Sequence, residues 1–287
     1  MKRHVVFTAL VGGYDSIRQP LVVDDRFEYI VFSNEIAQER IGVWTIKPVD
    51  YYNLDSTRVC RYVKTHPEHL LPGYDFYIWV DCNIQIRSDY IYSRALRLYE
   101  DGIEVSALKH PFRSCIYDEC FAVVNLMVEH EDVVLKWGHF LKKEDYPKNN
   151  GLAETGVLFR VNNNHVFVFD NLWWDCINSY SRRDQLSFNY CLWKLGIDSN
   201  DFLAGRILRD CSDFLLSQHK KPLQNHCEFS KNEAWLMRYC WKHPERTNLI
   251  KEFYYRIYSS RFPLICARIM GQVFRVVNWI DNRWKRN

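Results

Sequence analysis

The stretch Tyr74–Asn83, which reads YDFYIWVDCN, decides the fold class of this 287-residue chain. Its first seven residues, up to Val80, are almost all apolar or aromatic, and they follow the turn-forming pair Pro72-Gly73. A short apolar run without alternation predicts a strand buried on both faces, which is typical of parallel sheets covered by helices on both sides. The run ends where the polar residues Asp81 and Asn83 begin.

The segments on either side of this strand continue the pattern. His4–Val11 and Phe27–Phe32 are predicted strands, and a helix is expected to begin at Asp55-Ser56, where an aspartate can cap it. A helix over Tyr90–Glu100 and a strand over Glu104–Leu108 follow. This alternation predicts an α/β fold with a mainly parallel central sheet. Because ligands of such sheets bind beyond the carboxyl ends of the strands, the polar residues that end the first three strands are predicted to line one site.

The second half of the chain has a mixed pattern. Gly156–Val161 and His165–Phe169 are predicted strands. Ser181–Leu195 is a predicted helix, at whose start Ser181 and Asp184 fit a capping box.

The composition sets broad limits on function. Apolar residues make up 47% of the chain and charged residues 25%, which is ordinary for a globular protein. The net charge of +3 gives no reason to expect nucleic-acid binding. The ten cysteines form no C-x-x-C pair, and we find neither a secretory signal nor a run of about eighteen apolar residues. We therefore expect reduced thiols and a cytoplasmic location.

Three sets of side chains could bind a metal ion or a phosphate. Asp81 and Asn83 offer oxygen ligands of the kind that Mn²⁺ and Mg²⁺ prefer, although a simple Asx turn would look the same. Three cations on one predicted helix could hold a nucleotide diphosphate or form a solvated face. A late His-Lys pair could bind metal and phosphate together. The last two sets are Arg58, Arg61 and Lys64, and His219 with Lys220.

Other side chains are candidates for catalysis and sugar binding. Glu154 lies between small residues before a predicted strand, where it could meet a sugar hydroxyl or form part of a turn. Asp184 and Gln185 lie at a helix N-terminus, where Asp184 could instead be only a cap. Aromatic rings and polar groups suit the contact with a sugar acceptor, and the candidates for it are His110, Arg113, Tyr117, Trp173, Trp174 and Arg183.

The order of these motifs resembles a known family. The motifs are Thr8–Asp15 (TALVGGYD), Ile78–Ile84 (IWVDCNI), His110-Pro111 with Arg113, Gly151-Leu152 with Glu154-Thr155, and Arg183–Phe188 (RDQLSF). Together they resemble a glycosyltransferase-like family, long labelled a domain of unknown function, that includes proposed plant galacturonosyltransferases of mucilage. The resemblance covers roughly residues 4 to 220.

This resemblance implies a GT-A fold, a UDP-sugar donor and a divalent metal, Mn²⁺ or Mg²⁺. By position it places Asp81 and Asn83 at the metal, and His219 would correspond to a late metal-binding histidine of glycogenin-like enzymes. The residues expected to hold the nucleotide are Thr8, Ala9, Gly13 and Tyr14, to which the strand-ending Asn34 is added.

The last part of the chain differs in charge. We assign residues 1–225 to the α/β domain and 226–287 to a helical extension. In residues 246–287 basic residues outnumber acidic ones nine to two, and apolar residues recur at helical spacing. Such a helix, with Trp279 and Trp284 near its end, can lie on an anionic membrane or pack on the core with its basic face in solvent.

Three functions are compatible with these patterns. The first is the transfer of a sugar from a UDP-sugar to a glycan or lipid-linked acceptor of a surface polysaccharide, at the cytoplasmic face of the membrane. The second is a metal-dependent hydrolase of a lipid or glycan, with a metal site built from His110, Asp118, Glu119 and His219. The third is a carbohydrate-binding protein without catalysis. Fold alone does not separate them.

Overall fold

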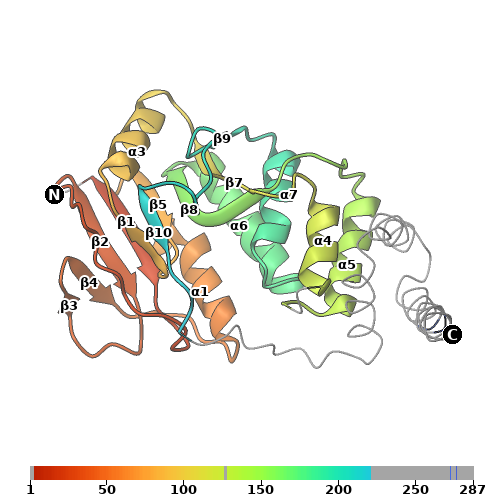
Figure 1. Ribbon diagram of the computed structural model, residues 1–287, viewed down its shortest axis with the longest axis horizontal. Coiled ribbons are helices and arrows are strands. Elements are labelled where there is room, and N and C mark those ends of the chain that lie inside the picture. The colour runs from red at the N-terminus through yellow and green to blue at the C-terminus, as the bar shows by residue number, and fades with distance from the viewer. Residues whose placement is uncertain (1–2, 126–127, 221–271, 273–275, 277–287) are drawn as a thin grey trace, which may run out of the picture. The chain divides into compact units, whose positions relative to one another are not determined.

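The computed structural model describes residues 3–125, 128–220, 272 and 276 (Figure 1). The chain divides into two compact units, one made of residues 1–112 with 151–223 and the other of 113–150 with 224–287. This division groups residues 113–150 with the second unit, whereas the sequence assigned them to the α/β domain. The amphipathic basic segment predicted at 246–287 lies outside the described residues, apart from positions 272 and 276.

The first unit is built on an eight-stranded sheet in the order β3-β4-β2-β1-β5-β8-β7-β9. Strand β1 lies parallel to β2 and β5, β2 to β4, and β7 to β9, while β8 runs antiparallel between β5 and β7. The mainly parallel α/β sheet is therefore confirmed. The strands are β1 (His4–Ala9), β2 (Phe27–Phe32), β3 (Arg40–Ile41), β4 (Trp44–Lys47), β5 (Phe76–Val80), β7 (Val105–Lys109), β8 (Ala153–Val161) and β9 (Ser199–Asp201).

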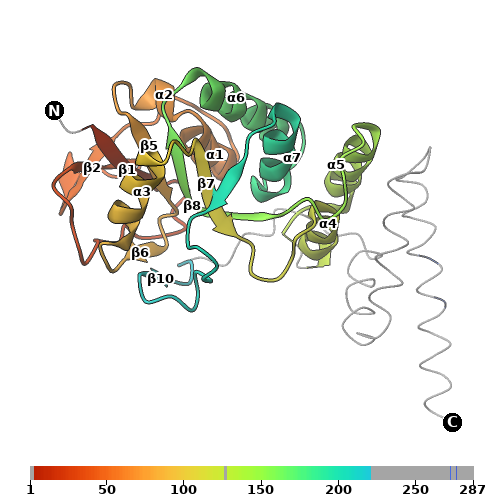
Figure 2. The same cartoon turned by 90° about the horizontal axis from the view of Figure 1, so that it is seen from above.

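Helices cover both faces of this sheet, as Figure 2 shows from above. One face carries α1 (Ser56–Thr65), α2 (Pro67–Leu70), α6 (Asn164–Ser179) and α7 (Gln185–Leu195). The other carries α3 (Tyr90–Glu100) and a small antiparallel pair of β6 (Ile84–Ile86) and β10 (Phe214–Leu216). A strand between two such layers must be apolar on both sides, which explains the sequence of the central strand.

Strand β5 confirms the prediction made from YDFYIWV. All five of its residues are buried. Phe76, Ile78 and Val80 belong to the same apolar core as the residues of α3, while Trp79 packs edge-on against Phe7 at a centroid distance of 5.2 Å. Asp81 therefore lies at the carboxyl end of a strand that the core holds from both sides.

The predicted strand over His165–Phe169 is wrong, because these residues lie in α6. Asn163 caps this helix, its Oδ1 accepting a hydrogen bond from the backbone N–H of Val166 at 2.8 Å. The β-branched residues of the segment favour a strand locally. Burial of Phe169 against Phe188 of α7 overrides that preference.

The second unit contains α4 (Ile116–Asn125) and α5 (Glu131–Lys143). Tyr117 is buried, and its hydroxyl donates to the carbonyl of Tyr146 at 3.0 Å. Among the residues that the structure describes, none of the helices has the length and apolar character needed to cross a membrane.

Candidate functional site

Asp81 lies at the centre of the carboxyl edge of the sheet. Its backbone N–H donates to the carbonyl of Gly156 on β8 at 2.8 Å, and its Oδ1 accepts from the indole N–H of Trp79 at 2.7 Å. These bonds fix the carboxylate, yet 34% of the side chain remains exposed. Asp81 is therefore a rigid anion that a ligand can reach.

A buried ion-pair cluster lies behind Asp81 on the α1 face. Lys64 is fully buried, with its Nζ 2.6 Å from Oδ2 of Asp184 and 3.6 Å from Oδ1 of Asp81. Arg61 approaches the other oxygen of Asp184 at 3.1 Å, and the Thr155 hydroxyl donates to Oδ2 at 2.9 Å. Lys64 thus joins the exposed carboxylate of Asp81 to a buried one.

The Asp184 carboxylate forms buried ion pairs and does not cap helix α7. Burial alone would raise the pKa of its carboxyl group, but Arg61 and Lys64 hold that pKa well below its usual range. Asp184 makes no side-chain capping bond at the start of α7, so the predicted capping box is wrong, and Ser181 Oγ accepts from the N–H of Arg183 instead. A buried carboxylate that stays charged is suited to positioning Lys64 rather than to exchanging protons.

The three cations predicted for a diphosphate all have internal partners. Arg61 and Lys64 pair with Asp184, as described above. Arg58 donates to the carbonyls of Ile177 and Tyr180 at the end of α6. The charge that α1 was expected to offer to a ligand is therefore already engaged within the fold.

Glu154 and Gln185 keep their side chains available. Both are half-buried, and neither makes a hydrogen bond or ion pair within the part of the chain that the structure describes. Burial raises the pKa of Glu154, and Arg209 and Asp81 lie close enough to act on it as well. A half-buried carboxyl group of this kind can take up or release a proton.

The loop after β1 is held by segments from elsewhere in the chain. Gly13 donates its N–H to Oε2 of Glu35 at 3.0 Å, and the carbonyl of Tyr14 accepts from the N–H of Lys220 at 2.9 Å. Ala9 is buried at the end of β1. The Asn34 amide bonds both the N–H and the carbonyl of Val49, so it supports the backbone.

His219 is tied to the same loop. Its Nδ1 lies 3.0 Å from Oδ1 of Asp15, and this bond raises the pKa of the imidazole above its ordinary value. Asp81 raises that pKa further, while Arg183 lowers it. His219, Arg183 and Asp81 therefore share one electrostatic environment.

The pairing of His219 with Asp15 should depend on pH. Because the folded-state pKa of His219 is raised, the stabilisation is complete below the unfolded pKa near 6.5 and is lost as the pH rises through the folded value. An NMR titration of the imidazole should give a pKa above 6.5 in the unaltered chain, and Asp15→Asn should bring it down. A pKa that Asp15→Asn leaves unchanged would contradict the pairing.

The predicted metal ligands fit a divalent cation only in part. Asn83 is buried, and its amide donates to the carbonyl of Ser217 at 3.0 Å. No three His, Cys, Asp or Glu side chains of the described residues come together as a metal site. A cation beside Asp81 would therefore need oxygens from a substrate phosphate, an arrangement typical of Mg²⁺.

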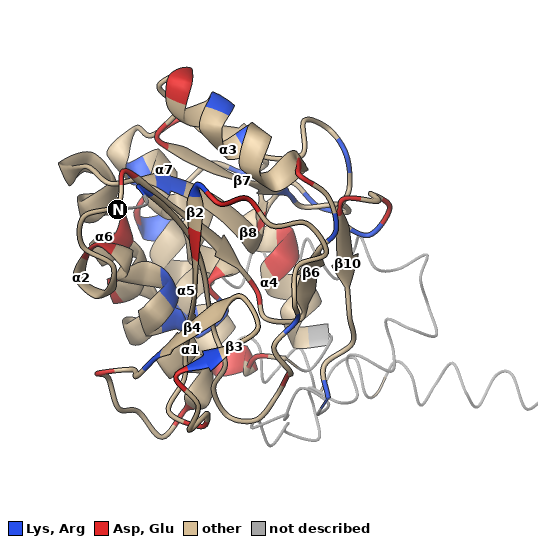
Figure 3. Ribbon diagram, turned by 90° about the vertical axis from the view of Figure 1, so that its left-hand side faces the viewer, with Lys and Arg blue, Asp and Glu red and all other residues tan. Residues whose placement is uncertain are grey.

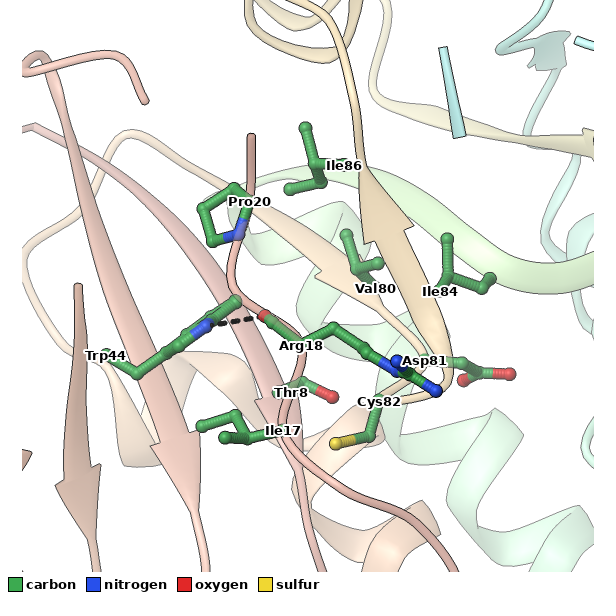
Figure 4. Close-up of a pocket in the computed structure, with 10 residues that line it drawn as sticks. All are labelled: Thr8, Ile17, Arg18, Pro20, Trp44, Val80, Asp81, Cys82, Ile84 and Ile86. Carbon is green, nitrogen blue, oxygen red and sulfur yellow. Dashed lines mark hydrogen bonds between the residues drawn. The ribbon is translucent and has the colours of Figure 1, made fainter. Parts of the chain in front are cut away.

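A pocket opens on the other side of Asp81 (Figure 4). Its empty space of about 270 Å³ includes open solvent, and the part that its walls enclose has room for only about one water molecule. The motifs in the sequence pointed to Thr8 and Asp81 but missed the other walls, among them Arg18 and the buried Trp44. The lining residues are Thr8, Ile17, Arg18, Pro20, Trp44, Val80, Asp81, Cys82, Ile84 and Ile86.

The two tryptophans predicted to stack on a sugar are packed against other side chains of the protein. Trp173 is fully buried and donates its indole N–H to the carbonyl of Asp184 at 2.9 Å, so it has no exposed face for a sugar. Trp174 is half-buried and packs edge-on against Tyr51, Tyr62 and His66, at centroid distances of 5.4–5.5 Å. Trp173 is a core residue, which corrects the prediction.

The predicted acceptor residues around His110 are divided between the two units. His110 Nδ1 accepts from the N–H of Phe112 at 3.2 Å in the first unit. In the second, Arg113 pairs with Glu119, and Tyr117 is buried. Because Glu119 pairs with Arg113 and His219 with Asp15, the metal set predicted for a hydrolase is not formed among the described residues.

Charge on the first unit is mixed rather than gathered by sign. Figure 3 shows basic and acidic residues interspersed along its helices and strand ends. Local pairs such as those of Asp184 therefore decide the electrostatics of the site.

Comparison with known proteins relates the chain to one curated protein and to one family. Over 230 residues the chain is 24% identical to a protein of Arabidopsis thaliana named alkaline ceramidase TOD1. The match covers 65% of this chain and 47% of the relative, so the chain spans about half the length of that relative. The model of a family described as the TOD1/MUCI70 glycosyltransferase-like domain matches residues 1–221. The chain therefore belongs to the TOD1/MUCI70 glycosyltransferase-like domain family.

Proposed function

We propose that this protein transfers a sugar, a hexose or a uronic acid, from a UDP-sugar to a glycan or lipid-linked acceptor of a surface polysaccharide. The observation that carries the proposal is Asp81, an exposed carboxylate fixed at the carboxyl end of β5 and backed by the Lys64–Asp184 pair. The family supports a glycosyltransferase in general. The proposed cytoplasmic setting rests on the cysteine pattern and the start of the sequence, and the proposed contact with an anionic membrane rests on the sequence of residues 246–287.

In this reaction the bond between the anomeric carbon and the β-phosphate oxygen breaks, and the acceptor hydroxyl oxygen forms a new bond to that carbon. The acceptor loses its proton, and Glu154, with its raised pKa and unengaged carboxyl group, is the group that we assign to receive it. Lys64 holds Asp81 in place without leaving the core. Asp81 and His219 would hold a divalent cation with the diphosphate, and such a cation stabilises charge on the leaving group.

Isothermal titration with UDP, with and without Mn²⁺, tests this function. We expect UDP to bind, and Mn²⁺ to tighten the binding because few protein groups could hold the ion without the diphosphate. A panel of UDP-sugars should then contain one that the chain hydrolyses slowly without acceptor. Absence of UDP binding in both conditions would contradict the proposal.

A second candidate is the hydrolysis of a ceramide amide bond, to which the name of the Arabidopsis relative points. The apolar wall of the pocket and the exposed residues Leu21, Val22 and Val23 of the neighbouring loop could receive a lipid chain. Release of fatty acid from ceramide, without any nucleotide and lost in Asp81→Asn, would favour this candidate over the transferase.

A further inference from the structure

The pocket beside Asp81 contains a cation to which the sequence motifs gave no role. Arg18 lines the pocket, and Figure 4 shows its guanidinium reaching toward Asp81 and Cys82. The residue is exposed, and its guanidinium has no ion pair or hydrogen bond within the described part of the chain. A cation in this position is available to a ligand.

The backbone around Arg18 is anchored on both sides. Its carbonyl accepts from the indole N–H of Trp44 at 2.9 Å. The next residue, Gln19, bonds the carbonyl of Ile41 and the N–H of Val43, and Leu21 donates to the carbonyl of Ile86. These hydrogen bonds hold the backbone of Arg18 in place at the mouth of the pocket.

The cations that α1 contributes near Asp81 are not available to an anion. A phosphate next to Asp81 would be repelled unless a cation compensates for the carboxylate. Lys64 and Arg61 are engaged with Asp184, and Arg58 with backbone carbonyls. Arg18 is the cation that both lines the pocket and keeps its guanidinium unengaged within residues 3–125 and 128–220.

The interior of the pocket gives a second sign of a ligand. Thr8 is 3% exposed, and its hydroxyl has no hydrogen-bond partner. A buried hydroxyl without a partner destabilises the fold, and a polar ligand atom could supply the missing hydrogen bond. The opposite wall is apolar and includes Trp44 and Ile17. An anionic ligand at the mouth, held by Arg18 and with a polar atom near Thr8, matches this lining.

We infer that Arg18 binds the diphosphate of the donor and makes this pocket select a nucleoside diphosphate over the nucleoside. The inference rests on the proposed function, and it assigns to Arg18 the role that was predicted for the cations of α1. The guanidinium can donate two parallel hydrogen bonds to phosphate oxygens, which a lysine cannot reproduce.

The test is the affinity of UDP and of uridine for the unaltered chain, Arg18→Gln and Arg18→Lys, by isothermal titration with Mn²⁺ present. We expect Arg18→Gln to weaken UDP about ten- to hundredfold, as for other hydrogen bonds to charged groups, while uridine changes less than about threefold. Arg18→Lys should recover part of the loss. The affinity for UDP should also depend less steeply on salt in Arg18→Gln, because one ionic contact is gone.

Arg97→Gln is the matched control, since Arg97 is an exposed arginine on α3 outside the pocket. It should bind UDP like the unaltered chain, and the thermal unfolding midpoint of each variant shows that the fold is retained. If Arg18→Gln discriminates UDP from uridine as well as the unaltered chain does, the role of Arg18 is overturned while the proposed function stands. If the unaltered chain binds no UDP, both fall together.

Discussion

Replacing Asp184 with alanine should lower the free energy of unfolding by about 3–5 kcal/mol, the usual effect of removing one partner from a buried ion pair. Lys64 has no exposed surface, and its Nζ lies 2.6 Å from Asp184. Without that carboxylate, the buried Lys64 and the largely buried Arg61 would keep the more exposed Asp81 as an acidic neighbour. Urea denaturation followed by circular dichroism measures the change.

Asp101→Ala provides the comparison for this variant. Asp101 pairs with Arg97 at 3.7 Å on the surface, with more than half of each side chain exposed. Surface pairs of this kind contribute about 0–1 kcal/mol, so this variant should unfold nearly like the unaltered chain. A loss below about 1 kcal/mol in Asp184→Ala would show that Lys64 finds another partner or loses its proton, and would contradict the positioning role.

The parts of the fold that were predictable from sequence are those with a strong local pattern. The run up to Val80 is apolar on both sides because both faces of β5 are covered, and Tyr90–Glu100 has the period of a helix packed on one face. The helix at Asp55-Ser56 was predictable from its cap, and Asp55 does accept from the N–H of Thr57. Each of these patterns is contained within a short segment, so it can be recognised from the sequence alone.

The site was less predictable because its contacts join residues distant in sequence. Lys64 and Asp184 are 120 positions apart, and their pairing changes both predictions made for them. The S-x-x-D pattern at Ser181 predicts a capping box from local sequence alone. In the fold, the Asp184 carboxylate pairs with Lys64 and does not cap the helix. The dipeptide Trp173-Trp174 does not indicate how deeply either side chain is buried. Trp173 was therefore predicted to stack on a sugar, although it is fully buried.

The pocket was missed for a related reason. Its walls come from β1, β4, the end of β5, β6 and the loop before β2, and no single sequence motif joins all of these. Arg18 lies between Ile17 and Gln19 with nothing nearby to mark it as a ligand-binding residue. The Thr8 hydroxyl, which is buried near the end of β1 without a hydrogen-bond partner, indicates a ligand site. This indication depends on burial, which the sequence does not show.

Asp81→Asn should reduce the rate of sugar transfer from the donor about 10²–10³-fold, the range seen when one preorganised electrostatic group is removed from an active site. The substitution preserves shape, and an amide oxygen can still accept from the indole N–H of Trp79 as Oδ1 does now. What it removes is the negative charge, the property needed to hold a cation next to a diphosphate. The effect should therefore appear in the turnover number while the fold remains intact.

Initial rates with the donor found in the UDP-sugar panel measure this loss, and thermal unfolding of the same samples verifies the fold. Asp75→Asn is the matched control, because Asp75 precedes the other end of β5 and pairs with the exposed Arg3. That variant should turn over donor at the rate of the unaltered chain. If Asp81→Asn retains more than about a tenth of the rate, the charge of Asp81 is not used in the reaction. Glu154, a half-buried carboxyl group whose pKa is raised by burial, would then be the residue on which the transferase proposal depends.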